Sequence, residues 1–165
     1  MKRSQLETAH TLAVLVENKA GVLARVAGLF ARRGFNIESL AVAPTDDRFS
    51  RITIVVDGES APIDQIKKQL DKLIDVIEID ELSPEHSALR EMVLVRMELA
   101  DEADVVAVEE LVAGFSGSVL RVRGVQMILS LSSRPTELDS FIEKIQPFGI
   151  AELQRTGAIA IPGIN

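Results

Sequence analysis

Residues 11–35 have the sequence TLAVLVENKAGVLARVAGLFARRGF, and this stretch decides the fold of the first half of the chain. The nearly continuous apolar run at residues 11–16 predicts a buried β-strand. Residues 18–21 interrupt it, and the apolar residues that follow recur at the spacing of one helical face: Val22, Leu23, Val26, Ala27, Leu29 and Phe30. Arg32 and Arg33 suit the negative end of a helix dipole, and Gly34 supplies a left-handed cap. The stretch therefore predicts a strand, a tight loop and a helix that ends at Gly34.

The rest of the first half continues the alternation of strands and helices. Residues 36–45 and 51–57 predict two strands joined by a turn, because apolar and polar side chains alternate along the second of them. The spacing of Ile63, Ile66, Leu70 and Leu73 predicts a helix, with Pro62 in its first turn. A fourth strand is expected at residues 76–82. The predicted order is β-α-β-β-α-β, which is the order of a ferredoxin-like unit.

The same order repeats in the second half of the chain. A strand is expected at residues 92–99, a helix at 105–115, a hairpin at 118–131, a second helix at 138–145 and a last strand at 150–161. Residues 83–87 form a candidate linker, so we expect an α+β protein with two ferredoxin-like domains at residues 1–84 and 85–165. Domains this small bury only about 60% of their unfolded surface, so we also expect a homodimer or another partner.

The composition argues against several classes of function. The chain has 165 residues, no cysteine and a net charge of −7. Disulfides and thiolate chemistry are excluded, and the acidic excess opposes binding to nucleic acid. No apolar run approaches the ~20 residues that span a bilayer, and residues 1–10 lack the apolar stretch of a signal peptide. We expect a cytoplasmic protein with no nucleic-acid or membrane partner.

No set of residues in the sequence has the pattern of a catalytic centre. His10 and His86 are the only histidines, both are expected in loops, and neither has carboxylates at metal-ligand spacing. The adjacent carboxylates at residues 46–47 and 109–110 are expected in a turn and on an exposed helix face. The glycines form neither a dinucleotide-binding fingerprint nor a phosphate-binding loop. We therefore expect no catalytic residue, metal site or cofactor site in this chain.

The loop at residues 17–23 has the features of a binding site, because it joins a buried strand to the N-terminus of a helix. The first N–H groups of a helix are unpaired and carry partial positive charge, so they can receive a carboxylate. Gly21 lets a ligand approach the backbone closely, and Asn18 offers both a donor and an acceptor. Spacing alone favours a plainer role for Asn18 as the helix cap. The pattern by itself leaves both interpretations open.

Several stretches closely resemble the small subunits of acetohydroxyacid synthase, also called acetolactate synthase. In the first half they are residues 10–30, 33–42, 44–47 and 50–55; in the second half, residues 89–95, 147–150 and 155–157. An Asn or Asp, then Gly, then an apolar helix is common to many amino-acid-binding ACT domains. The run RRGFNIESLAV at residues 32–42 is much more particular to this family. The chain departs from the family in a shorter turn after Asp47 and in Ala20, where Pro is frequent.

This resemblance implies a regulatory subunit in branched-chain amino-acid biosynthesis. Such subunits bind a separate catalytic subunit, which carries thiamine diphosphate, FAD and Mg²⁺ and condenses pyruvate with pyruvate or 2-ketobutyrate. They raise its activity and confer feedback inhibition, usually by valine, and the C-terminal domain would mainly engage the catalytic subunit. In the family, valine lies where two N-terminal ACT domains meet. Carried over, the site would take from one protomer Asn18, Ala20, Gly21, Val22 and Leu23, and from the other Asn36 and Ile37.

Three other functions fit the same predicted fold. A free-standing ACT protein would sense an amino acid and regulate transcription or another enzyme. An acylphosphatase would need an arginine in the loop after the first strand, where this chain offers only Lys19. An RNA-binding domain would need aromatic side chains on its strands to stack bases, and the predicted strands lack them.

Overall fold

The computed structural model describes residues 9–57, 62–83 and 85–163. The chain divides into two compact units. The first contains the chain up to Leu89 together with the segment from Ala158 onward, and the second contains residues 90–157. The N-terminal residues 1–8 and Pro84, which figure in the sequence-based predictions, lie outside the described residues.

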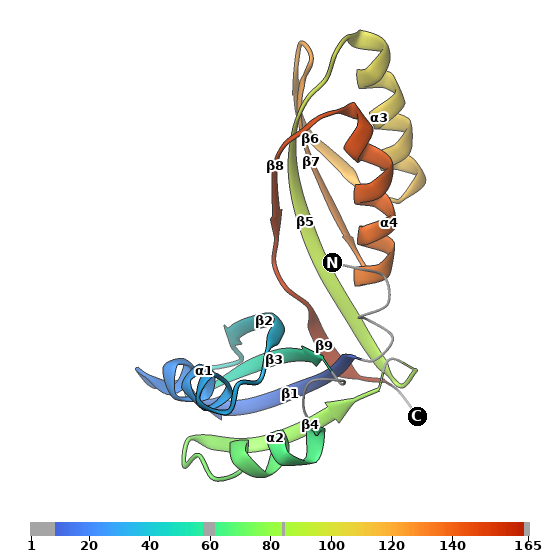
Figure 1. Ribbon diagram of the computed structural model, residues 1–165. Coiled ribbons are helices and arrows are strands. Elements are labelled where there is room, and N and C mark those ends of the chain that lie inside the picture. The colour runs from blue at the N-terminus through green and yellow to red at the C-terminus, as the bar shows by residue number, and fades with distance from the viewer. Residues whose placement is uncertain (1–8, 58–61, 84, 164–165) are drawn as a thin grey trace. The chain divides into compact units, whose positions relative to one another are not determined.

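The first unit is a four-stranded antiparallel sheet with two helices (Figure 1). Its elements are β1 (Ala9–Glu17), α1 (Val22–Arg33), β2 (Ile37–Pro44), β3 (Phe49–Asp57), α2 (Ile63–Leu70) and β4 (Val76–Leu82). The strands lie in the order β2-β3-β1-β4. The aliphatic residues of one sheet face pack against α1 and α2, and this core includes Leu12, Val14, Ile52, Ile54, Val26, Phe30, Ile66 and Leu70.

The second unit repeats this architecture. Its elements are β5 (Ser87–Glu98), of which residues 87–89 belong to the first unit, α3 (Glu102–Gly114), β6 (Ser118–Arg123), β7 (Gln126–Ser133), α4 (Pro135–Ile145), a 3-10 turn (Gln146–Phe148) and β8 (Ile150–Arg155). The strand order β6-β7-β5-β8 corresponds to that of the first unit. Buried and exposed residues alternate from Glu91 to Glu98, so one face of β5 packs on the helices. The predicted α+β class and the repeated βαββαβ order are therefore confirmed.

Three sequence-based boundaries are wrong. α2 ends at Leu70, and Leu73 reaches the core from the turn that follows the helix. β5 begins at Ser87, so the expected linker is a short turn in which the backbone N–H of His86 donates to the carbonyl of Ser83 at 3.2 Å. The expected last strand divides in two, because Gly157 adopts a φ of +79° and interrupts it.

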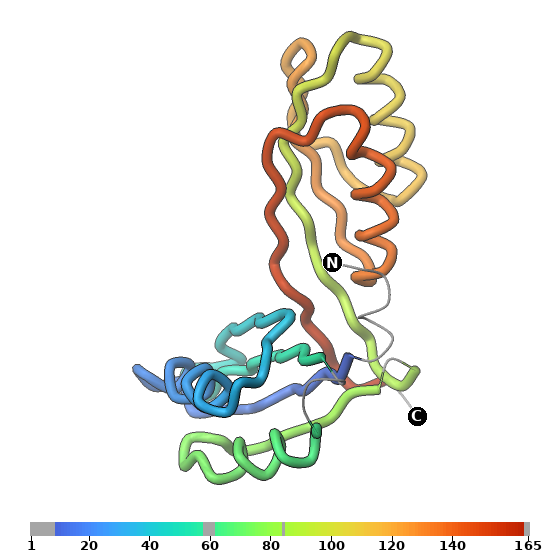
Figure 2. Tube along the Cα trace, in the orientation of Figure 1, coloured from blue at the N-terminus to red at the C-terminus, as the bar shows by residue number. Residues whose placement is uncertain are grey.

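The second part of that divided strand belongs to the first unit. β9 (Ile159–Pro162) pairs with β5, as the red end of the trace in Figure 2 shows. Its Ala160 is 4% exposed and packs in a small apolar cluster with Ala13 and Leu82. Ala13 alternates along β1 with the residues that face α1 and α2, so β9 covers the sheet face opposite the helices.

Replacement of Ala160 by Asp should detach β9 from the first unit. A buried carboxylate without a partner is unfavourable, so the free energy of unfolding should fall by about 1–3 kcal/mol. Ile159 is the matched control, because it is 60% exposed in the same strand and Ile159→Asp should leave stability within about 0.5 kcal/mol. Urea unfolding of both variants measures the difference. Equal losses from the two substitutions would contradict this role of β9.

Candidate functional site

The loop between β1 and α1 presents a helix N-terminus that no side chain caps. The N-cap residue is Gly21, with a φ of +84°, and no side chain accepts a hydrogen bond there. The prediction that Asn18 caps the helix is wrong, because a turn closed by the Val22 N–H and the Lys19 carbonyl moves the helix start further along the chain. Asn18 instead donates its backbone N–H to the carbonyl of Arg48 at 2.7 Å, and its side chain lies at the exposed surface.

An ion pair braces this loop. Arg25 of α1 donates from Nε and Nη2 to one carboxylate oxygen of Asp75, both at 2.8 Å, and the Asp75 side chain is 9% exposed. The carbonyl of Asp75 accepts the backbone N–H of Glu17 at 2.9 Å. The remaining guanidinium nitrogen, Nη1, lies 3.1 Å from the place where a Cβ on Gly21 would be. The loop therefore combines a helix N-terminus with a fixed cation, an arrangement suited to an anionic group.

The predicted apolar side chains of the loop differ in exposure. Val22 is 4% exposed and belongs to the core of the first unit, so it offers its backbone rather than its side chain to the surface. Leu23 is 39% exposed, and Ala20 is also exposed. Asn36 is exposed and donates its side-chain amide to Glu38, while Ile37 packs partly buried against the core.

The two predicted halves of the site lie at opposite ends of one sheet. Glu17, at the end of β1, pairs with Phe49 of β3, whereas Ile37, at the start of β2, pairs with Val56 of the same strand. Phe49 and Val56 are seven positions apart, which corresponds to about 23 Å along a strand. A single protomer therefore does not bring residues 18–23 and residues 36–37 around one small ligand.

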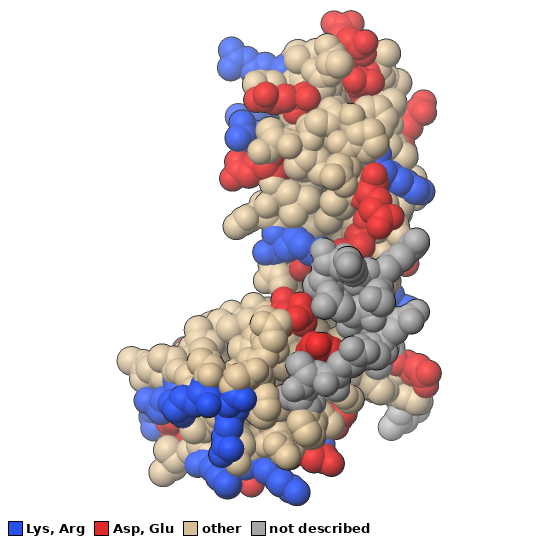
Figure 3. Space-filling model, viewed as in Figure 1, with Lys and Arg blue, Asp and Glu red and all other residues tan. Residues whose placement is uncertain are grey.

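The helices of the first unit carry a local positive charge on an acidic chain. α1 has Arg32 and Arg33 in its last turn and no acidic residue in its first, and α2 carries Lys67 and Lys68. Figure 3 shows Lys and Arg side chains gathered over these helices. This field favours the approach of small anions to the first unit.

The two histidines and the carboxylates of the described residues form no metal-binding cluster. No three His, Asp or Glu residues among them are placed to hold a metal ion. His10 lies in β1 rather than in the predicted loop, with Nδ1 3.2 Å from Oε1 of Glu81. His86 lies in a turn, with Nδ1 3.1 Å from the Ser83 hydroxyl. No helix in the described parts of the chain is long and apolar enough to cross a membrane.

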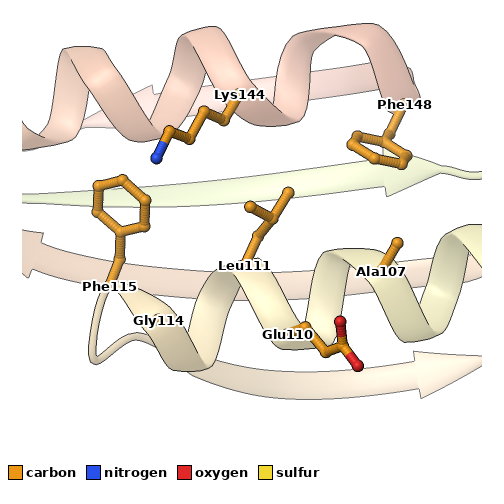
Figure 4. A pocket seen from close by; sticks show the side chains of 7 residues that line it. All are labelled: Ala107, Glu110, Leu111, Gly114, Phe115, Lys144 and Phe148. Carbon is orange, nitrogen blue, oxygen red and sulfur yellow. The ribbon is translucent and has the colours of Figure 1, made fainter.

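The second unit has a shallow groove between α3 and α4 that the sequence did not predict. Its volume is about 490 Å³, and Figure 4 shows Leu111 of α3 and Phe115, which follows this helix, pointing toward Lys144 of α4. Nζ of Lys144 lies 4.7 Å from the centroid of the Phe115 ring. The remaining lining residues are Ala107, Glu110, Gly114 and Phe148. The groove is mostly apolar.

Comparison with known proteins gives one family over most of the chain. Residues 12–78 match the model of the ACT domain of acetohydroxyacid synthase small subunits, and residues 90–163 match the model of the small subunit of acetolactate synthase. The acetolactate synthase small subunit of Mycobacterium bovis is 47% identical over 154 residues, covering 92% of this chain and 90% of that one. The probable small subunit of Archaeoglobus fulgidus is 46% identical, covering 92% of this chain and 95% of its own.

A solved structure extends this similarity to three dimensions. The crystal structure of the acetolactate synthase small subunit from Thermotoga maritima superposes with a TM-score of 0.87 at 34% sequence identity. The match covers 95% of this chain and 98% of that chain, so it extends over both units. This chain therefore belongs to the small, regulatory subunits of acetolactate synthase.

Proposed function

We propose that this chain activates a separate acetohydroxyacid synthase catalytic subunit and makes it sensitive to feedback inhibition by valine. The observation that carries the proposal is the match to small subunits over 92% of the chain. The catalytic subunit would hold thiamine diphosphate, FAD and Mg²⁺ and form the acetohydroxy acids, while this chain contributes regulation. Residues 1–84 would bind the effector and dimerise, and residues 85–165 would contact the catalytic subunit.

The proposed effector site lies between two protomers. The carboxylate of valine would accept hydrogen bonds from the first N–H groups of α1, beside Gly21 and the guanidinium of Arg25. Asn18 of the same protomer, together with Asn36 of the other protomer, would orient the polar end of the ligand. Leu23 of the same protomer, together with Ile37 of the other protomer, would contact the isopropyl group of valine. The strand positions that pair with Glu17 and Ile37 lie seven residues apart along β3, which supports a site shared by two protomers. Residues 18–23 and residues 36–37 of one chain are too far apart to contact the same small ligand.

The free edge of β2 offers a route to that dimer. β2 is an outer strand of the first sheet, and within the described residues its outer edge pairs with no other strand. If two copies pair antiparallel through β2, Ile37 of one protomer lies beside Pro44 of the other. Pro44 pairs with Ser50 and Glu17 pairs with Phe49, so Pro44 marks the sheet end where the loop at residues 18–21 begins. Antiparallel pairing thus brings residues 36–37 toward the effector loop of the second copy.

Valine should therefore stabilise the dimer by mass action. At a valine concentration 100 times its own dissociation constant, each occupied site adds about 2.7 kcal/mol, so the dimer dissociation constant should fall at least about 100-fold. Sedimentation velocity over a dilution series, with and without valine, measures this shift, and glycine serves as the control ligand without a side chain. A monomer that binds valine with full affinity would rule out the shared site.

A further inference from the structure

The β6–β7 hairpin gathers exposed apolar side chains of the second unit. Leu120 is 56% exposed, Val122 42%, Val125 37% and Ile128 36%. These four residues lie on both faces of the hairpin, because Val122 pairs with the buried Met127 whereas Ile128 pairs with Arg121, and together they make the hairpin unusually apolar for an exposed segment. β7 anchors the hairpin in the core of the second unit, where Met127 and Leu129 are at most 1% exposed.

β6 is also an outer strand. It lies at the end of the order β6-β7-β5-β8, and within residues 9–57, 62–83 and 85–163 its outer edge pairs with no further strand. An apolar outer strand with free N–H and C=O groups is a template for strand addition. The register between β6 and β7 shifts between Val119 and Arg121, which leaves Leu120 at the irregularity. Such bulges commonly occur at sheet edges, where they redirect side chains.

The charge on the hairpin has a single sign. Arg121 and Arg123 lie in β6, residues 118–133 contain no acidic residue, and the whole chain has a net charge of −7. No ion pair among the described residues involves either arginine. Arg121 pairs in register with Ile128 and Arg123 with Gln126, so both arginines project from the same face of the sheet. The edge therefore combines apolar contacts with two positive charges at alternate positions.

We propose that the outer edge of β6 binds an extended, acidic segment of the catalytic subunit by strand addition. Main-chain hydrogen bonds to β6 would give affinity, and carboxylates at alternate positions of the added strand would pair with Arg121 and Arg123. A second copy of this chain is a poor occupant, because antiparallel pairing over the full length of β6 would set Arg121 opposite Leu120 and Arg123 opposite Ser118, so neither arginine would meet a carboxylate. The inference rests on the proposed function for the identity of the partner.

Charge reversal in the full-length chain tests this surface. The double variant Arg121→Glu/Arg123→Glu should bind the cognate catalytic subunit at least about 10-fold more weakly, since like charges across an interface cost several kcal/mol. The matched control is Arg32→Glu/Arg33→Glu, which reverses two adjacent, exposed arginines of α1 and should change affinity much less. Thermal unfolding and valine calorimetry of each variant verify that fold and effector site are retained.

Hydrogen exchange on the complex tests the binding mode itself. Backbone amides of residues 118–123 should exchange more slowly when the catalytic subunit is bound. If the wild-type chain binds, but the double variant binds equally well and these amides remain unprotected, this inference alone is overturned. If both double variants weaken binding equally, or if Arg121→Glu/Arg123→Glu disrupts self-association instead, the assignment of β6 to the catalytic subunit is also overturned. A wild-type chain that neither binds nor affects the catalytic subunit would overturn the proposed function as well.

Discussion

Gly21→Asp should make the catalytic subunit insensitive to valine while its activation by this chain persists. The new carboxylate would lie beside Nη1 of Arg25, which is 3.1 Å from the position of the added Cβ. It would thus occupy the place proposed for the carboxylate of valine, and like charges at one site cost several kcal/mol. We expect the valine concentration for half inhibition to rise about 100-fold or more. Inhibition curves at saturating subunit concentration measure this change.

Gly21→Asn is the matched control for that experiment. Gly21 has a φ of +84°, so any side chain there carries backbone strain, and Asn tolerates this region about as well as Asp. Asn has nearly the shape of Asp without its charge, so the difference between the two variants isolates the electrostatic effect. Gly21→Asn should shift inhibition much less than Gly21→Asp. A Gly21→Asp variant with wild-type sensitivity to valine would mean that the anion site lies elsewhere.

Arg155→Ala should lower the free energy of unfolding of the second unit much more than removal of an exposed ion pair does. Arg155 donates to Glu91 from Nε at 3.0 Å and from Nη2 at 2.6 Å, and to Asp139 from Nη1 at 2.6 Å. The Glu91 side chain is 7% exposed and that of Asp139 is 17% exposed. Removing the guanidinium leaves two mostly buried carboxylates without their cation, which costs about 3–5 kcal/mol. Urea unfolding followed by circular dichroism measures the loss.

Arg96→Ala provides the comparison for this prediction. Arg96 also pairs with a carboxylate, that of Glu152 at 3.2 Å, but the two side chains are 49% and 67% exposed. An exposed pair contributes at most about 1 kcal/mol, so its removal should have a small effect. The pKa of Arg155 is raised above its ordinary value, chiefly by the hydrogen bond to Glu91, so its charge persists at ordinary pH. Similar losses from Arg155→Ala and Arg96→Ala would contradict the importance of burial.

The sequence predicted the order of elements because hydrophobic periodicity is a local property. The aliphatic alternation in β3 and β5 and the spacing in α1 each lie within one element. The return of β9 to the first unit was not predictable in this way, since it depends on pairing with β5 and on the positive φ of Gly157. These contacts join residues far apart in the chain, and no local pattern encodes them.

The candidate site was predictable only in part for the same reason. The loop around Gly21 has a local signature, so its place before a helix follows from the sequence. The brace between Arg25 and Asp75 joins residues 50 positions apart, and neither residue has a distinctive neighbourhood in the sequence. Gly21 and Asn36 lie at opposite ends of the sheet, and this placement follows only from the pairing register of β1, β2 and β3. That register supplies the physical argument for a site shared by two protomers.

Titration of the full-length chain into its cognate catalytic subunit tests the central claim most directly. Acetolactate formation from pyruvate is followed at increasing chain concentration, with and without valine, and with the chain alone as the blank. The chain alone should form no acetolactate, its addition should raise the activity of the catalytic subunit to a plateau, and valine should then lower that plateau. Such coupling between distant sites typically amounts to about 1–3 kcal/mol, or 5- to 150-fold in affinity. A catalytic rate that stays unchanged at every chain concentration, with or without valine, would contradict the proposed regulation and favour a free-standing amino-acid sensor.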